Sequence, residues 1–179
     1  MPNWTMISVR FDGNENEINN MLEFIKGEDG VFDFNKVIPM PKSLEISEGS
    51  EADRAMKCYE AERVGKRDRE LIKNQYHITD QEFQRYKELG KIYSDNEKKY
   101  GYRSWYGWCN ANWNTKWNAC DASYTNGVLY FETAWNFPTP VMKKLSEMYP
   151  DITMMFEVED EGYDGVDRFS LKNGERTEE

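Results

Sequence analysis

The sequence predicts an α+β fold of the ferredoxin-like kind, a split β-α-β antiparallel sheet with two helices packed on one face and a helical insertion. Strand-like alternation of apolar residues recurs near both ends of the chain, two amphipathic helices stand between strands, and a charged, helix-like stretch divides the halves. A length of 179 residues suits one core. We therefore expect a single domain over residues 1–179, with a helical insertion over 50–100 and a flexible acidic tail over 173–179.

The N-terminal half is predicted to run strand, helix, strand. Apolar residues alternate with polar ones over residues 7–11, and Asp12-Gly13 then closes the strand. Asn14-x-x-Glu17 is typical of a helix start, and apolar residues follow at helical spacing up to residue 25. Residues 32–38 are aromatic and β-branched and end at Pro39 and Pro41, which predicts a second strand.

Residues 50–100 differ from the rest because they are charged and free of proline. Helix starts are predicted at Ser50-x-x-Asp53 and Thr79-x-x-Glu82. Two thin apolar stripes would let each helix bury one face against the main body: Ala52, Ala55, Met56 and Tyr59 in the first, Phe83, Tyr86 and Leu89 in the second. The insertion is then either a solvated helical cover or a partner-binding face.

The C-terminal half is predicted to run hairpin, helix, strand, edge strand. A tryptophan-rich stretch leads into a strand over 119–124, and Asn126-Gly127 is a strong hairpin signal before the returning strand over 128–134. Thr139 is expected to cap a helix that has Pro140 at its first position and ends before Pro150. Alternation over 152–158 predicts another strand, and residues 166–171 predict an edge strand.

Composition argues against several classes of protein. No apolar run approaches the roughly 18 residues of a membrane span, and the first residues lack a signal-peptide pattern, so we expect a cytoplasmic protein. Three cysteines without a CxxC pair and one histidine, His77, argue against a disulfide framework or a zinc site. Because there is no Gly-rich phosphate loop, GxSxG or HExxH motif either, we expect no cofactor and favour a non-enzymatic protein.

Charge is unevenly distributed along the chain, whose formal net charge is −10. Residues 157–179 hold nine acids against three bases, whereas residues 51–100 hold twelve bases against eleven acids. The second stretch includes a basic cluster that could meet a phosphate backbone, and we take as candidate binding residues Arg63, Lys66, Arg67 and Lys73.

The strongest candidate site lies in the tryptophan-rich stretch. Its candidate binding residues are Trp113, Asn114, Thr115, Lys116 and Trp117, joined by Trp135. Two tryptophans beside hydrogen-bonding groups could stack a ligand. The alternative is that the tryptophans pack the insertion onto the sheet while Asn and Thr complete a turn. Carboxylates on the strands could hold a divalent ion or simply face water, namely Asp33, Asp121, Glu132 and Glu157.

Four segments carry a family likeness: residues 1–4, 32–41, 112–119, and 131–135 followed by Pro138-Thr139-Pro140. In this order they resemble the ferredoxin-like domain family named after the plasmid protein YubB. Thr5 stands where a cysteine is common in that family, and Asn114 where glycine is common. The resemblance implies a setting on phages, plasmids and related mobile elements, and it implies no shared activity.

Three functions follow as hypotheses. The first is a non-enzymatic anti-defence inhibitor that binds a host effector, such as a CRISPR effector, by presenting the carboxylates of the acidic C-terminal region in place of phosphates. The second is a nucleic-acid-binding module that uses the sheet or the basic cluster. The third is an RNA-processing nuclease, for which no group of residues supplies an acid-base pair or a nucleophile.

Overall fold

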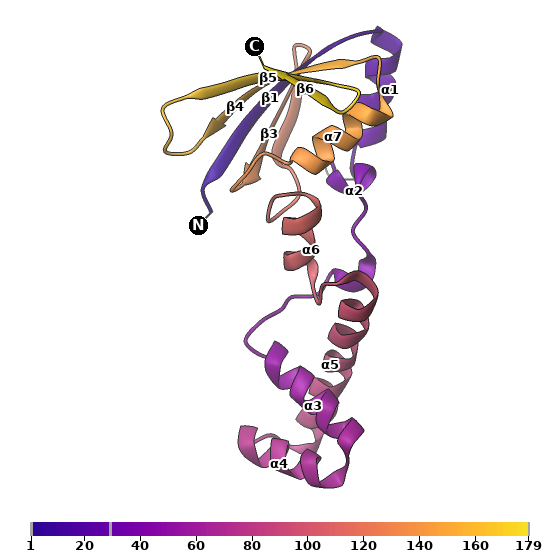
Figure 1. Ribbon diagram of the computed structural model, residues 1–179, viewed down its shortest axis with the longest axis vertical. Coiled ribbons are helices and arrows are strands. Elements are labelled where there is room, and N and C mark those ends of the chain that lie inside the picture. The colour runs from indigo at the N-terminus through magenta and orange to yellow at the C-terminus, as the bar shows by residue number, and fades with distance from the viewer. Residues whose placement is uncertain (1, 29, 179) are drawn as a thin grey trace. The chain divides into compact units, whose positions relative to one another are not determined.

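The computed structural model describes residues 2–28 and 30–178, which divide into two compact units (Figure 1). Unit 1 contains Met1–Met40 and Cys109–Glu179, and unit 2 contains Pro41–Trp108. Within unit 1, the Sδ of Met40 and the Sγ of Cys109 lie 3.8 Å apart. The chain therefore leaves unit 1 and returns to it at neighbouring points.

Unit 1 is built on a six-stranded sheet with the strand order β2-β3-β1-β4-β5-β6, in which every neighbouring pair is antiparallel. The strands are β1 (Trp4–Asp12), β2 (Cys120–Thr125), β3 (Val128–Ala134), β4 (Thr153–Asp160), β5 (Val166–Lys172) and β6 (Glu175–Glu178). The first four strands have the order of a ferredoxin-like split β-α-β sheet, with β3 between β1 and β2 and with β1 between β3 and β4. The predicted fold class is confirmed.

Three helices cover one face of this sheet, α1 (Glu15–Ile25), α2 (Phe34–Val37) and α7 (Thr139–Met148) (Figure 1). Asn14 caps α1 as expected, since its side chain accepts hydrogen bonds from the backbone N–H groups of Asn16 and Glu17. Ile7 and Val9 of β1 are buried, and they alternate with Met6, Ser8 and Arg10, which point to the other face. Apolar alternation along β1 thus decides which face of the sheet the helices cover.

The predicted strand over residues 32–38 is wrong, because this segment forms the short helix α2. Asp33 caps the helix by accepting a hydrogen bond from the backbone N–H of Asn35. Asn118 Oδ1 accepts a second one, 2.8 Å from the backbone N of Phe34. Phe34 packs edge-on against Phe131 of β3. The two capping hydrogen bonds, one to the Asp33 side chain and one to the Asn118 side chain, outweigh the weak strand preference of these aromatic and β-branched residues.

Two further details of the C-terminal half differ from expectation. Thr139 is the first residue of α7 and does not cap it; Pro138 stands at the cap without a side-chain hydrogen bond. Strand β5 is not an edge strand, because Asn173-Gly174 turns the chain with positive φ at both residues and β6 pairs with its outer side. The segment assigned to an acidic tail thus contributes a strand, whereas Glu179 lies outside the described residues.

The Asn126-Gly127 hairpin is confirmed. Both residues have positive φ, 53° and 78°, as a type I′ turn requires, and β2 and β3 pair on either side. The pairing shifts register between Cys120 and Ser123, where Asp121 has a φ of 47°. Asp121, the second residue of β2, therefore lies in an irregular part of the β2–β3 pairing.

Unit 2 is helical. Its elements are the 3₁₀ turn η1 (Lys42–Leu44), then α3 (Ala52–Val64), α4 (Lys66–Tyr76) and α5 (Asp80–Tyr100), and α6 (Trp105–Asn112) leads back into unit 1. The two apolar stripes were expected to pack against the main body, but they pack on each other. One cluster holds Ala52, Ala55, Cys58 and Ala61 of α3 with Phe83, Tyr86 and Tyr93 of α5. Glu51, not Ser50, stands at the start of α3, whereas Thr79 and Glu82 form the expected capping box on α5. In the part of the chain that the structure describes, no helix is long and apolar enough to cross a membrane.

Candidate functional site

The sheet face opposite α1, α2 and α7 is here called the open face. On it, side chains of β1 lie directly opposite side chains of β3 and β4. Met6 of β1 lies opposite Glu132 of β3 on one side and opposite Glu159 of β4 on the other. One step along β1, Ser8 lies between Tyr130 and Glu157. Met6 and Tyr130 are 40% and 45% exposed, so this face combines accessible apolar surface with carboxylates.

A hollow of about 310 Å³ lies at the centre of the open face. Its lining includes Met6, Ser8 and Tyr130 together with the four acids Asp121, Glu132, Glu157 and Glu159. Glu157 forms an ion pair with Arg168 of β5 at 3.0 Å. Among residues 2–28 and 30–178, by contrast, no lysine or arginine pairs with Glu132 or Glu159.

The negative charge of this face acts on a neighbouring thiol. Burial raises the pKa of Cys120, and the charges of Asp121 and Glu132 raise it further. The first effect disfavours the thiolate through desolvation and the second through repulsion between like charges. Cys120 lies opposite Glu132 in the β2–β3 pair, so the carboxylate of Glu132 on β3 affects the thiol on the neighbouring strand β2.

Tryptophan rings gather at one end of the open face. The rings of Trp4 and Trp117 lie 6.0 Å apart between centroids, and both residues are half-buried. The Nζ of Lys116 lies 4.4 Å from the ring centroid of Trp117 and 5.4 Å from that of Trp135. We call these four residues the tryptophan cluster. Its indole faces already hold one cation, which is the arrangement of a cation–π contact.

Trp135 takes an unusual backbone conformation. Its φ is 79°, which is uncommon for a bulky residue and costs on the order of 1–3 kcal/mol. Its backbone N–H donates to the carbonyl of Asn3, and the side chain remains 39% exposed. Strained backbone that holds an aromatic ring at the surface is a feature often associated with binding sites.

The other residues of the candidate tryptophan-rich site have structural contacts. Trp113 is buried and donates its indole N–H to the carbonyl of Ile38 at 2.9 Å. Thr115, also buried, donates to the carbonyl of Ala134 at 2.8 Å. Asn114 occupies a turn with a φ of 63° and donates to the carbonyl of Phe137. These three residues hold the turn in place, while Lys116, Trp117 and Trp135 reach the surface.

Sequence reasoning missed Trp4 as a member of the cluster. The alternation of side chains along a strand could have identified it, because Trp4, Met6 and Ser8 are every second residue of β1 and therefore share one face of the sheet. Trp117, by contrast, follows a turn whose geometry depends on Asn114 and Thr115, so no periodicity places it beside Trp4.

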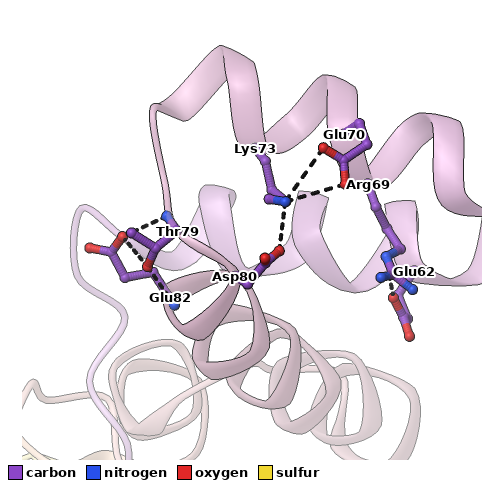
Figure 2. A network of polar contacts seen from close by, with 7 residues as sticks. All are labelled: Glu62, Arg69, Glu70, Lys73, Thr79, Asp80 and Glu82. Carbon is purple, nitrogen blue, oxygen red and sulfur yellow. Dashed lines mark hydrogen bonds and ion pairs between the residues drawn. The ribbon is translucent and has the colours of Figure 1, made fainter.

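The basic cluster belongs to unit 2 and is partly neutralised. Figure 2 shows Lys73 of α4 between Glu70 of the same helix and Asp80 of α5, with Nζ–O distances of 3.2 and 2.6 Å. In the same view Arg69 faces Glu62 of α3 at 3.3 Å, an ion pair that lacks hydrogen-bond geometry. Arg63, Lys66 and Arg67 are exposed. Lys73 therefore holds α4 against α5, and the other three candidate residues line the surface around the α3–α4 junction.

Other candidate residues have simple roles. His77 ends α4 in the left-handed region with a φ of 52°. Cys58 and Cys109 are buried free thiols, and burial raises the pKa of Cys109 to about 11. Asp33 caps α2, apart from the carboxylates of the open face. In the described part of the chain, no three His, Cys, Asp or Glu side chains gather closely enough to hold a metal ion.

The fold and this face define an α+β protein with a ferredoxin-like domain. Residues 112–179 match the family model described as the ferredoxin-like domain in Api92-like protein. The crystal structure of a protein Api92 from Yersinia pseudotuberculosis aligns over 100% of this chain and 98% of its own, with 7% identity and a TM-score of 0.47. No curated protein matches the sequence.

Proposed function

We propose that the protein is a non-enzymatic inhibitor that binds a basic surface of a partner protein with its open face. The observation that carries this proposal is the hollow in which Glu132 and Glu159 flank Met6, with no lysine or arginine of the described residues paired to either carboxylate. Two uncompensated carboxylates beside exposed apolar side chains favour a partner that brings positive charge. Interface centres are rich in tryptophan, tyrosine and methionine, which this face supplies.

A host effector that handles nucleic acid is the partner class that fits best. Such proteins carry basic channels for phosphates, and a protein that presents carboxylates at similar spacing competes for them. The resemblance to the YubB-type family supports a mobile-element origin, and so an anti-defence role against an effector such as a CRISPR nuclease. The same proposal places the protein in the cytoplasm of the host cell.

A nucleic-acid-binding role is the second candidate, and one observation favours it. Lys116 beside the rings of Trp117 and Trp135 is an arrangement that can stack a base next to a phosphate. Two observations weigh against it. The neighbouring open face is acidic, and Lys73 of the basic cluster is held by Glu70 and Asp80.

The test is an affinity capture of the tagged protein from host lysate, with and without nuclease treatment. We expect one stoichiometric partner for the wild type and its loss with the variant Glu132→Lys/Glu159→Lys. The control variant Glu45→Lys/Glu88→Lys makes the same change of charge at exposed positions of unit 2 and should retain the partner. Partners that vanish with nuclease treatment would instead support nucleic-acid binding. An unchanged partner with the open-face variant would contradict the proposed binding face.

A further inference from the structure

We propose that the open face and the tryptophan cluster together form a docking surface for arginine side chains of the partner. This inference rests on the proposed function and names the group that the face recognises. An arginine combines a long aliphatic stem with a flat cation, so it needs apolar surface, an aromatic ring and a carboxylate close together. The described part of unit 1 brings these three features together along β1.

The first step is the spacing of the carboxylates. Glu132 and Glu159 stand on the two strands that flank β1, and both lie opposite Met6. Neighbouring strands are about 4.8 Å apart, so the two backbones are separated by roughly 10 Å with the Met6 side chain between them. A guanidinium has five N–H donors in one plane and can bond carboxylates on two sides, which a lysine ammonium does with less geometric specificity.

The second step is the aromatic contact. Trp4 precedes Met6 on the same face of β1, and its ring lies against that of Trp117. Lys116 already holds its ammonium 4.4 Å from the Trp117 ring centroid. This intramolecular contact is independent of the carboxylates and shows that an indole ring of the cluster packs against a cation, which an incoming arginine would displace. Tryptophan is the strongest cation–π partner, and arginine uses it more often than lysine does.

The negative charge of the open face distinguishes between classes of partner. A nucleic acid would bring phosphates toward Glu132, Glu159 and Glu157, and at this short range like charges repel. A protein segment rich in arginine brings the opposite charge. Since the same segments bind phosphates in nucleic-acid-handling proteins, the surface fits an arginine-rich segment of such a protein.

The probes are two capped pentapeptides of equal charge, Arg-Gly-Arg-Gly-Arg and Lys-Gly-Lys-Gly-Lys, titrated into the full-length protein and followed by the NMR signals of the tryptophan indole N–H groups. We expect the arginine peptide to bind about fivefold more tightly than the lysine peptide, as one added cation–π contact provides. Glu132→Gln/Glu159→Gln should weaken both peptides by up to about tenfold, because surface ion pairs are modest. The control Glu45→Gln/Glu88→Gln should change neither affinity.

Two leucine variants examine the rings without removing their apolar volume. Trp4→Leu and Trp117→Leu should abolish the preference for arginine, whereas Trp105→Leu, a half-buried tryptophan of unit 2, should retain it. Thermal unfolding of each variant verifies that it is folded. Equal affinity for the two peptides, or a preference that survives both Trp4→Leu and Trp117→Leu, would overturn the inference. If the captured partner is still lost with Glu132→Lys/Glu159→Lys, the proposed function stands even though the arginine preference has failed.

Discussion

The spacing of the two long helices of unit 2 depends on a residue that has no side chain. A Cβ placed on Gly90 of α5 would lie 2.1 Å from the carbonyl oxygen of Ala55 and 2.9 Å from the Cβ of Tyr59. Both contacts are too short for any real Cβ, and the first is with backbone that cannot rotate away. The close packing of α3 on α5 therefore requires glycine at position 90.

Gly90→Ala should destabilise the protein even though alanine favours helices. Helix propensity alone would stabilise α5 by about 1 kcal/mol, but overpacking against rigid backbone costs about 1–3 kcal/mol or more. We expect a net loss in the free energy of unfolding, measured by urea denaturation. Gly49→Ala, which meets nothing within 4 Å, should change stability by no more than about 0.5 kcal/mol. A stabilised Gly90→Ala variant would contradict the packing described for these helices.

The sequence predicted the roles of single residues where these depend on close neighbours in the chain, as in helix caps and hairpin turns. Asn14, Thr79 and the Asn126-Gly127 pair have the roles that their residue types predict. Trp113 and Trp117 show the opposite case, since similar surroundings in the sequence lead one to the core and the other to the surface. Which of them is buried depends on Ile38 and Trp4, residues far away in the chain.

At the scale of elements, α4 is held by polar contacts as well as by Ile72 and Tyr76, which pack partly buried against the core between α3 and α5. None of its residues is fully buried, and Lys73 links it to the start of α5 through Asp80 (Figure 2). The hydrogen bond from Lys73 lowers the pKa of the Asp80 carboxyl, and the positive charge of Lys73 lowers it further. Charge on both partners is therefore part of what keeps α4 in place.

Acid should weaken this attachment. Because the pKa of Asp80 is lower in the folded protein than the value of about 3.9 in an unfolded chain, its contribution is present above that value and is lost as the pH falls through the folded pKa. An NMR titration should show the Asp80 carboxyl titrating below the ordinary range in the wild type and returning to it in Lys73→Met. Lys66→Met, on the same helix, should leave it low. The same low value in Lys73→Met would refute the role given to Lys73.

Sequence patterns identified long elements better than short ones. Strands β1, β3 and β4 have a period of two that is visible in the sequence because one face of each packs on the core. The short helix α2 was missed although Asp33 caps it locally, because four residues show no helical period and the second capping hydrogen bond, to the backbone N of Phe34, comes from Asn118. A contact between residues so distant in the chain has no signature in a local pattern.

At the scale of the whole molecule, the ferredoxin-like sheet is complete without unit 2. All six strands and α1, α2 and α7 belong to unit 1, and Met40 and Cys109 lie side by side where the chain leaves and returns. Insertions with adjacent ends tend to be separable from their host domain. The open face and the tryptophan cluster also belong entirely to unit 1.

Replacing residues 41–108 with Gly-Ser-Gly should therefore leave unit 1 folded. We expect a single cooperative thermal transition and retained β-sheet circular dichroism for the shortened protein. Binding of the arginine peptide should be unchanged, because every residue assigned to the docking surface remains. A shortened protein that does not fold would mean that unit 1 depends on unit 2. A shortened protein that folds but does not bind the peptide would mean that residues of unit 2 are needed for binding.

The most direct test of the central claim is a competition for the captured partner. With a fluorescent nucleic acid bound to that partner, we measure displacement by wild-type protein and by the variant Glu132→Lys/Glu159→Lys. The wild type should displace the nucleic acid and the variant should not, because both ligands need the same basic surface. Simultaneous binding of nucleic acid and wild-type protein to the partner would contradict the claim that the acidic open face substitutes for a phosphate backbone.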